Sequence, residues 1–427
     1  MDRIELHDVE YGDCTALVGR DQTVLMIDCG SVSQYTRQDN TGLDVRFDAV
    51  FRRYAPAKSR YFLLTHYHRD HLNGFVSRLK SDPLYFDRVY IPVIPQENGR
   101  SPLLELAVYA HLFTVPQSGF ALVNTACLTV FELLQKTVGT ARICTLSAGD
   151  VFTFDGDRYE VLSPGESFSY DERLYAATAS LNGIFARIPG AAAFLHSRDA
   201  FIKAYHACQK AFSPAGKLSL SAREELLCTL FSAWQTLEAQ RDIAELLSAA
   251  EQVRDILSDT TLRALYTETQ NDLSVVFQDK RLRGASPAVL FTGDASDKVL
   301  STLSTKLYNE YFAVKAPHHG TESHWSPVFS GMEVAHWLIS NGDYHAGSAV
   351  SGRYIAAEGV KHCTNRWACP WYKENESCCN RLLRCWEQPA SGALTLKCIA
   401  AAGNRHTPCN IYVFGHNGVR SCHCDRA

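Results

Sequence analysis

The sequence predicts a mixed α/β protein in which a long helical stretch separates two groups of strands along the chain. Apolar runs of strand length, divided by turn residues, open the chain over residues 4–27 and return over residues 273–340. Between these groups, over residues 166–265, apolar residues recur at helical spacing. With 427 residues, of which 46% are hydrophobic, the chain can bury a large core, so global disorder is excluded.

The individual elements follow from the local patterns. Strands are predicted over residues 4–9, 16–18, 23–27 and 60–64, with a helix over 45–54 before the last of them. Helices are predicted within 103–138, strands within 143–162, and long helical structure over 221–257 with Ser219 or Ser221 as the N-cap. The last strands are expected over residues 273–277, 288–292, 311–315, 334–340, 393–399 and 410–414.

These patterns divide the chain into four parts. Residues 1–165 and 266–360 are the two halves of the strand-rich core. Residues 166–265 are a helical insertion, expected to form a lid or a surface for a protein partner. Residues 361–427 are a cysteine-rich extension whose strands are expected to complete the sheet.

Charge and targeting patterns exclude some classes of function. A formal net charge of −4 gives no global case for a nucleic-acid coat protein or a protein that binds membrane surfaces. The N-terminus lacks the basic-then-apolar order of a signal peptide, and no later run approaches the length of a membrane span. The chain is therefore expected in the cytoplasm, without membrane contact. Its 15 cysteines cannot all pair internally, which favours reduced thiols.

The densest cluster of candidate metal ligands directly follows the predicted strand 60–64. It is the sequence HYHRDH at residues 66–71. Imidazole nitrogen and carboxylate oxygen suit zinc, and manganese and iron also accept them. Because residues two apart face the same way in extended backbone, His66 and His68 are expected to hold one ion. The turn into a helix would direct Asp70 and His71 to a second ion, whereas the alternative is a polar loop whose histidines only form hydrogen bonds.

Three neighbouring residues have two interpretations each. Asp28, at the end of a predicted strand, either holds the second nitrogen of a ligand histidine or only forms the turn before Gly30. Tyr67 and Arg69, which lie between the candidate ligands, either touch substrate or are exposed filler.

The C-terminal cysteines form a weaker candidate site. A structural zinc site is one interpretation, although no Cys-x-x-Cys pair is present and the spacings are irregular. The terminal Cys422-His423-Cys424 is expected to be frayed rather than to chelate a metal. The zinc site would draw on His362, Cys363, Cys369, Cys378, Cys379 and Cys385.

Several dispersed segments carry a resemblance to a known family. They are VEYGDCTALV, VLMIDCG, THYHRDHLNG, LSAGDVFTFDGDRYEVLSP, NDLSVVF, VLFTGDAS, VKAPHHGTESHWS and LISNGDYHAGS. Together they resemble the metallo-β-lactamase superfamily, and more narrowly the ComEC-type hydrolase domain and its free-standing relatives. The matching segments lie within residues 1–90, 147–164 and 271–356.

This resemblance implies a metallo-β-lactamase αβ/βα sandwich with a helical insertion, and a centre of two divalent metal ions. Zinc is the expected metal, with manganese or iron as alternatives. The resemblance implies that Asp294 bridges the ions and that His318, His319 and His345 supply the remaining contacts, His319 and His345 as ligands. Whether His318 or His319 is the ligand stays open. Asp70, His318 and His319 are the candidate catalytic residues, with Asp70 orienting the attacking hydroxide.

The chain departs from the family pattern at a few positions. Many members place a further metal-binding histidine before the bridging aspartate, where this chain has Asn271 and Ser274 on the expected strand. This departure fits the ComEC-type branch and disfavours a true β-lactamase or lactonase. The usual serine after His-His-Gly is Thr321, and the usual proline after the last histidine is Ala346.

The expected function is hydrolysis by a hydroxide that two metal ions activate. The resemblance favours a phosphodiesterase or nuclease, with a phosphodiester or nucleotide as substrate. Hydrolysis of a lactone, thioester or amide by the same hydroxide is the first alternative. The second is a metal-stabilised protein that binds a partner through the helical insertion and catalyses nothing.

Overall fold

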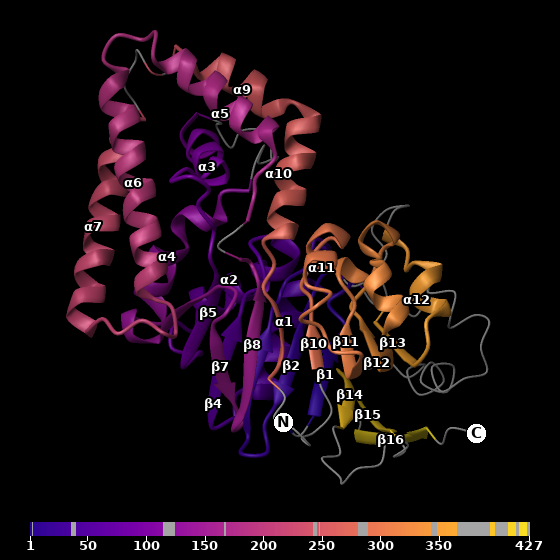
Figure 1. Cartoon of the computed structure of the whole chain (residues 1–427). Helices are drawn as coiled ribbons and strands as arrows, with labels where there is room; N and C mark the ends of the chain where they lie inside the picture. Colours follow the sequence, from indigo (N-terminus) through magenta and orange to yellow (C-terminus); the bar gives the residue numbers. More distant parts are fainter. Residues whose placement is uncertain are drawn as a thin grey trace.

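The computed structural model describes residues 1, 3–35, 40–113, 124–165, 168–241, 246, 248–280, 289–342, 348–364, 393–397, 409–415 and 418–424. Its strands form two mixed sheets, and helices surround them (Figure 1). The predicted α/β class is therefore confirmed. Among the described residues, no helix is both long and apolar enough to cross a membrane.

The first sheet combines N-terminal and C-terminal strands. Its order is β16-β15-β14-β1-β2-β3-β4-β5-β6, parallel from β3 to β6 and antiparallel elsewhere. The C-terminal strands extend the sheet because β14 pairs with β1. The strands are β1 (Arg3–His7), β2 (Thr15–Val18), β3 (Thr23–Ile27), β4 (Ser59–Leu63), β5 (Arg88–Pro92), β6 (Ile143–Leu146), β14 (Ala393–Lys397), β15 (Cys409–Gly415) and β16 (Gly418–Cys424).

One C-terminal expectation is wrong. The residues Cys422-His423-Cys424 are not a frayed end, because they lie in β16 and pair with β15. Regular ladder hydrogen bonds to a neighbouring strand order this backbone.

The second sheet has the order β13-β12-β11-β10-β9-β8-β7. Strands β10 to β13 are parallel, and β7 to β10 are antiparallel. The strands are β7 (Val151–Phe154), β8 (Asp157–Ser163), β9 (Val276–Asp279), β10 (Val289–Phe291), β11 (Glu310–Lys315), β12 (Glu333–Ile339) and β13 (Val360–Cys363).

The two sheets pack face to face, and β3 shows why its sequence is continuously apolar. Successive side chains of a strand point to opposite faces. Leu25 and Ile27 join the core between the sheets, which includes Phe277 and Phe291 of the second sheet. Val24 and Met26 join the core under the helices. Because both faces are buried, the strand does not alternate between apolar and polar residues.

The helices near the first sheet and the helices of the long helical stretch share one continuous core. Phe62 of β4 and Trp234 of α7 both belong to it. Figure 1 shows α6 and α7 running side by side along the outer edge of the molecule. The helices are α1 (Leu43–Tyr54), α2 (Arg69–Ser81), α3 (Pro102–Phe113), α4 (Ala126–Thr137), α5 (Glu172–Phe185), α6 (Ala191–Ala211), α7 (Leu220–Glu238), α9 (Ala250–Ser258), α10 (Thr260–Asp272), α11 (Asp297–Thr302) and α12 (Gly352–Ala356).

The helical structure predicted over residues 221–257 is interrupted. Helix α7 ends at Glu238, and a separate helix, α9, begins at Ala250. The break lets the two helices bury their apolar faces on different neighbours, since α7 packs on α6 whereas α9 packs on α3 and α10. The predicted cap is confirmed at Ser219, whose side chain accepts a hydrogen bond from the Ala222 backbone N–H.

A buried polar network joins the first strand to the first helix. Glu5 is fully buried on β1 and accepts hydrogen bonds from the Arg53 guanidinium at 2.5 and 2.8 Å and from the Tyr54 hydroxyl at 2.6 Å. Burial raises the pKa of Glu5, but Arg53 outweighs it and lowers the pKa to about 2. His7 lies 2.5 Å from the Tyr54 hydroxyl, and burial lowers its pKa to about 4.

We expect Glu5→Ala to lower the free energy of unfolding by about 1–3 kcal/mol, because it removes the buried carboxylate that accepts hydrogen bonds from Arg53 and Tyr54. Urea denaturation at pH 7 measures this change. The matched control is Glu224→Ala at an exposed position of α7, expected to change stability by less than about 0.5 kcal/mol. A loss below about 1 kcal/mol for Glu5→Ala would contradict the network's importance.

We also expect stability to fall as the pH drops from about 6.5 to about 4. The folded protein holds His7 neutral, whereas the unfolded chain takes up its proton near pH 6.5, so the unfolded state binds more protons in this window. The contribution of His7 is complete above pH 6.5 and is lost toward pH 4. Urea denaturation across this range should show a shallower dependence in His7→Gln, and identical slopes would refute the assignment.

Candidate metal centre

The HYHRDH motif lies where a strand gives way to a helix, as predicted. Strand β4 ends at Leu63, and α2 begins at Arg69 with His68 as its N-cap residue. The His68 side chain makes no capping hydrogen bond, so its ring is available for other contacts. Gly30 explains the close packing beneath this turn, because a Cβ there would lie 2.6 Å from the carbonyl oxygen of Arg69.

The second arm of the site comes from two neighbouring parallel strands of the other sheet. Asp294 follows β10, and His319 follows β11 in the short helix η3 (His318–Gly320). Parallel strands end at the same edge of a sheet, so both side chains reach one place. His318 and His319 have φ values of 45° and 59°, a left-handed backbone that residues with a Cβ adopt at a cost. Such strain is typical of functional sites.

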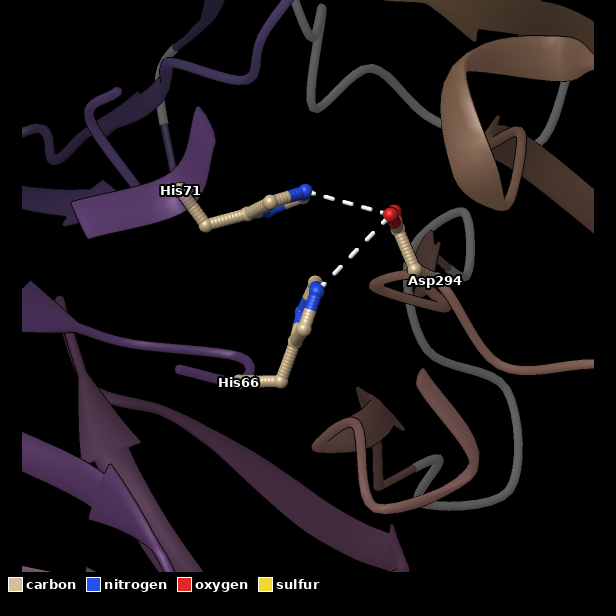
Figure 2. A group of neighbouring side chains, drawn as sticks. All are labelled: His66, His71 and Asp294. Atoms are coloured by element: carbon tan, nitrogen blue, oxygen red, sulfur yellow. Dashed lines mark hydrogen bonds and ion pairs between the residues drawn. The ribbon is translucent and has the colours of Figure 1, made fainter. Parts of the chain in front are cut away.

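Asp294 lies at the centre of this arrangement and is 1% exposed. Its Oδ2 is 3.2 Å from Nε2 of His71 and 3.8 Å from Nε2 of His66 (Figure 2). The ligand atoms of these three residues all lie within 4.8 Å of one another. The same oxygen is 3.9 Å from Nε2 of both His318 and His319. One buried carboxylate therefore faces four imidazoles.

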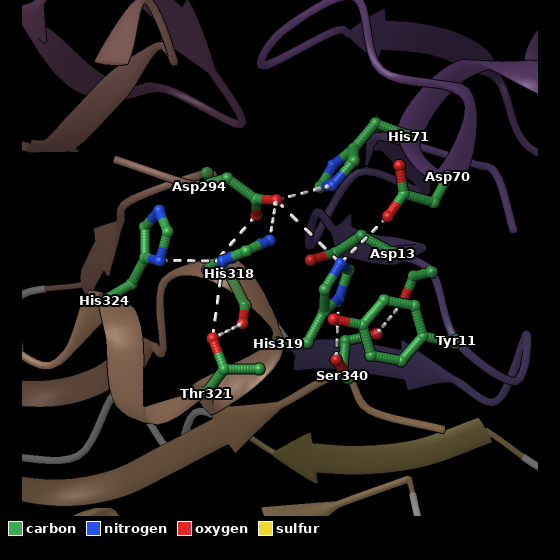
Figure 3. Close-up of polar contacts among 12 residues, drawn as sticks. Tyr11, Asp13, Asp70, His71, Asp294, His318, His319, Thr321, His324 and Ser340 are labelled. Atoms are coloured by element: carbon green, nitrogen blue, oxygen red, sulfur yellow. Dashed lines mark hydrogen bonds and ion pairs between the residues drawn. The ribbon is translucent and has the colours of Figure 1, made fainter. Parts of the chain in front are cut away.

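A second group of potential ligands adjoins the first. Asp70, His71 and His319 also have ligand atoms within 4.8 Å of one another. The Nε2 of His319 is 3.1 Å from Oδ2 of Asp70 (Figure 3). His71 belongs to both groups, so the groups meet at its ring.

Fixed hydrogen bonds orient two of these imidazoles. The Nδ1 of His71 lies 2.8 Å from Oδ2 of Asp28, so the contact predicted between Asp28 and the histidine cluster is present. Asp28 also accepts 2.7 Å hydrogen bonds from the backbone N–H and the hydroxyl of Thr65. The Nδ1 of His319 donates to the carbonyl oxygen of Ser340 at 3.0 Å, and the Tyr11 ring packs against it (Figure 3). Both rings thus direct Nε2 toward the centre, as ligand histidines do.

In a third group of potential ligands, one carboxylate is already paired with a lysine. Asp13, Asp28 and His71 also have ligand atoms within 4.8 Å of one another. However, the buried ammonium of Lys315 lies 2.5 Å from Oδ2 of Asp13, and the two side chains form an ion pair. Asp28 is held by Thr65 and His71. We therefore assign this group to the support of His71 rather than to metal binding.

The predicted division of ligands differs from the geometry. His66 was expected to share an ion with His68, yet its Nε2 faces Asp294 together with that of His71. The His68 ring lies 4.5 Å from the His66 ring, but His68 is in none of the compact groups found among the described residues. The helical turn at residues 69–71 brings His71 back beside His66, a proximity that strand alternation does not predict.

The two adjacent histidines, His318 and His319, have different surroundings. His319 is fully buried beside Asp70, whereas the side chain of His318 is 27% exposed. The Nδ1 of His318 lies 2.7 Å from Nδ1 of His324. His345 lies outside the described residues.

Electrostatics leaves the centre with ionised carboxylates. Burial raises the pKa of Asp70, but the hydrogen bond from His319 and the charge of His71 outweigh it and hold the pKa below its usual range. The pKa of Asp294 is also held well below its usual range, because nearby histidine charges outweigh burial. Burial depresses the pKa of His66, which keeps its imidazole neutral, the form that ligates metals.

These residues fit a divalent cation. Imidazole nitrogens and carboxylate oxygens are the donors that zinc and related metals take. The Nε2 atoms of His66 and His68 are buried and have no hydrogen-bond partner in the described part of the chain. Such orphaned acceptors cost about 1–3 kcal/mol each unless a ligand satisfies them.

Sequence reasoning missed the contribution of α10 and the segment before Trp325. Asn271 is in the last turn of α10, not on a strand, and Ser274 precedes β9, so the expected strand placement is wrong. Helix α10 continues to Asp272 and therefore includes Asn271, which had been expected on a strand. Ser274 accepts a hydrogen bond from the Asp294 backbone N–H at 2.9 Å. The sequence signal for His324 is its position, five residues after His319.

Tyr67 packs into the protein interior. It is 4% exposed, and its hydroxyl donates to the carbonyl oxygen of Pro92 at 3.0 Å. The expectation that it is exposed filler is therefore wrong. Arg69 is exposed.

The candidate cysteine site falls mostly outside the described residues, which include His362 and Cys363 but not Cys369, Cys378, Cys379 or Cys385. The Nε2 of His362 lies 3.1 Å from Nδ1 of His336 on the neighbouring strand β12. The cysteine-zinc interpretation stays a prediction.

Comparison with known proteins adds no family assignment. The chain matches no protein-family model, and no curated protein is significantly similar to it.

We expect His71→Ala to abolish the binding of divalent cations at this site, because His71 belongs to both groups of potential ligands. Asp28→Asn should weaken binding about 10–100-fold, the usual effect of removing the group that holds a ligand histidine. Metal content per chain, measured by inductively coupled plasma mass spectrometry after dialysis, tests both. His196→Ala, at an exposed position of α6, should bind as much metal as the unmodified protein. Full metal content in His71→Ala would exclude this centre.

Proposed function

We propose that the chain is a metal-dependent hydrolase of the metallo-β-lactamase fold, with a centre of two divalent cations and a phosphodiester as substrate. The observation that carries the proposal is the buried Asp294 carboxylate, which faces His66, His71, His318 and His319 from segments distant in sequence. Two face-to-face sheets, with the ligand-bearing turns at their edges, support the fold assignment.

Zinc fits the mixed nitrogen and oxygen donors best, and manganese and iron accept the same set. When bound, divalent cations supply Lewis acidity and lower the pKa of water enough to make it a nucleophile at neutral pH. Phosphodiester and ester hydrolysis both use these properties.

Two residues of the chain are placed to act on the substrate and the attacking water. Asp70 is ionised, and its side chain is 13% exposed, so it can accept a hydrogen bond from the attacking water and orient it. His318 has the most exposed imidazole around Asp294, which makes it the candidate donor to a substrate oxygen. His319, fully buried, is better suited to hold a metal.

The preference for a phosphodiester rests on the resemblance to ComEC-type hydrolases. Ester, lactone and thioester hydrolysis would use the same centre, so a substrate panel separates these activities. The helical surface made by α5 to α10 stays a candidate for substrate selection or for binding a protein partner.

We expect bis(p-nitrophenyl) phosphate to be hydrolysed faster than p-nitrophenyl acetate or a lactone, and chelation to abolish the activity. Asp294→Ala and His68→Ala should lose activity together with metal. His318→Ala should keep its metal and lose about 10²–10³-fold in kcat, the effect of removing one donor to the transition state. His196→Ala is the control. Undiminished turnover after chelation, with no metal left in the protein, would refute the proposal.

A further inference from the structure

Three consecutive residues that the proposed function does not use lie between the two arms of the centre. They are residues 11–13, called segment 11–13 below, in the turn between β1 and β2. The first arm carries Asp70 and His71 at the start of α2. The second arm carries Asp294 and His319 in the turns after β10 and β11. Segment 11–13 contacts both arms.

Backbone hydrogen bonds hold segment 11–13 to the first arm. The Asp13 backbone N–H donates to the carbonyl oxygen of Asp70 at 2.9 Å, and the Gly30 backbone N–H donates to the carbonyl oxygen of Asp13 at 3.0 Å. The packing here is close, because a Cβ on Gly12 would lie 2.1 Å from the carbonyl oxygen of Gly30. Segment 11–13 is therefore fixed to the first turn of α2.

Tyr11 and Gly12 contact the second arm. The Tyr11 ring packs on the His319 ring, with the two centroids 4.4 Å apart (Figure 3). The hydroxyl of Ser340, the residue after β12, donates to the carbonyl oxygen of Gly12 at 2.8 Å. A Cβ on Gly342 would lie 2.2 Å from the backbone nitrogen of Tyr11, so the two backbones are also in close contact.

Asp13 adds a buried ion pair to these contacts. Its Oδ2 lies 2.5 Å from the ammonium of Lys315, and both side chains are at most 4% exposed. Lys315 ends β11, the strand that leads to His319, and its carbonyl oxygen accepts a 2.7 Å hydrogen bond from the hydroxyl of Thr292, just before Asp294. A buried ion pair adds little net stability over apolar side chains, but removal of one partner is costly, so the pair holds its partners together.

We propose that segment 11–13 fixes the separation of the two arms of the metal centre, and that Asp13 and Lys315 are its main positioning residues. This inference rests on the metal-dependent function proposed above. The ligands of a metal centre must be held within about 0.5 Å of their productive places. The ion pair joins the backbone that holds Asp70 to the strand that leads to His319, so it acts on the distance between these two ligands.

The two sides of the centre are connected by different contacts. On the His66 side, the backbone N–H of Val275 donates to the carbonyl oxygen of Thr65 at 2.9 Å and joins the two arms. Segment 11–13 acts on the other side, where Asp70 lies 3.1 Å from His319. Loss of the ion pair should therefore weaken the ion on the Asp70–His319 side and spare the other.

The test compares the unmodified protein with the double variant Asp13→Asn/Lys315→Met. Removing both charges leaves no buried ion unpaired, so this variant should fold. After chelation and dialysis, zinc titration by isothermal calorimetry should show one of two ions bound about 10–100-fold more weakly, the effect of losing a group that holds a ligand. X-ray absorption of the zinc-loaded unmodified protein should show a zinc–zinc distance of about 3.5–4 Å, which the variant should lengthen or lose.

A second buried lysine of the same sheet provides the matched control. Lys361 on β13 is 1% exposed, and its ammonium donates to the carbonyl oxygens of Ala357 and Gly359. Lys361→Met should leave both zinc affinities and the zinc–zinc distance unchanged. The comparison separates the loss of a buried lysine from the loss of the connection between the arms.

The outcomes separate the two proposals. If the unmodified protein binds fewer than two ions of zinc, manganese or iron, the proposed function itself fails. If it binds two, and the folded double variant keeps both affinities and the zinc–zinc distance, the function stands and this inference is overturned.

Should the double variant fail to fold by circular dichroism, Ser340→Ala decides. This variant removes only the hydroxyl that donates to the Gly12 carbonyl oxygen, and the backbone of Ser340 still accepts from His319. It should weaken one ion about two- to tenfold, the effect of one hydrogen bond. Unchanged zinc affinities in Ser340→Ala would overturn the inference.

Discussion

The buried negative charge of Asp294 is the constraint on which the rest of the site depends. A carboxylate that is 1% exposed must be compensated by charge or hydrogen bonds, because uncompensated burial of an ion is strongly unfavourable. Four imidazoles face this carboxylate, and the His318 backbone N–H donates to its Oδ1 at 3.2 Å. A cation shared by these groups would satisfy the carboxylate and the orphaned nitrogen of His66 together.

The sheets provide the rigidity that this arrangement needs. Strands buried on both faces cannot shift without exposing apolar side chains, so their ends are fixed in space. His66, Asp294 and His319 lie within four residues of the ends of β4, β10 and β11, and Asp70 and His71 lie in the first turn of α2. The buried ion pair of Asp13 and Lys315 also connects the two sheets close to His71. The positive φ values of His318 and His319 are tolerated because both flanking elements hold them.

The helical stretch is more closely connected to the centre than an inserted lid would need to be. Its residues share a continuous core with the outer face of the first sheet. Its last helix, α10, ends beside the centre and carries Glu268, Gln270 and Asn271.

The sequence by itself determined the α/β class, the order of most elements, and the strand-to-helix position of the HYHRDH motif. Local rules suffice for these features, because apolar periodicity and caps act over a few residues. Asp28 was also within reach of such reasoning, since a carboxylate at a strand end near ligand histidines has an evident partner.

Only the tertiary structure decided how the candidate ligands group. The pairing of His66 with His71, the separation of His318 from His319, and the approach of His324 to Glu268 all depend on turns and on contacts between distant segments. Sequence spacing gives the direction of a side chain relative to its neighbours in one element. It does not give the distance between elements, because that distance is set by packing of the two sheets and the helices against one another.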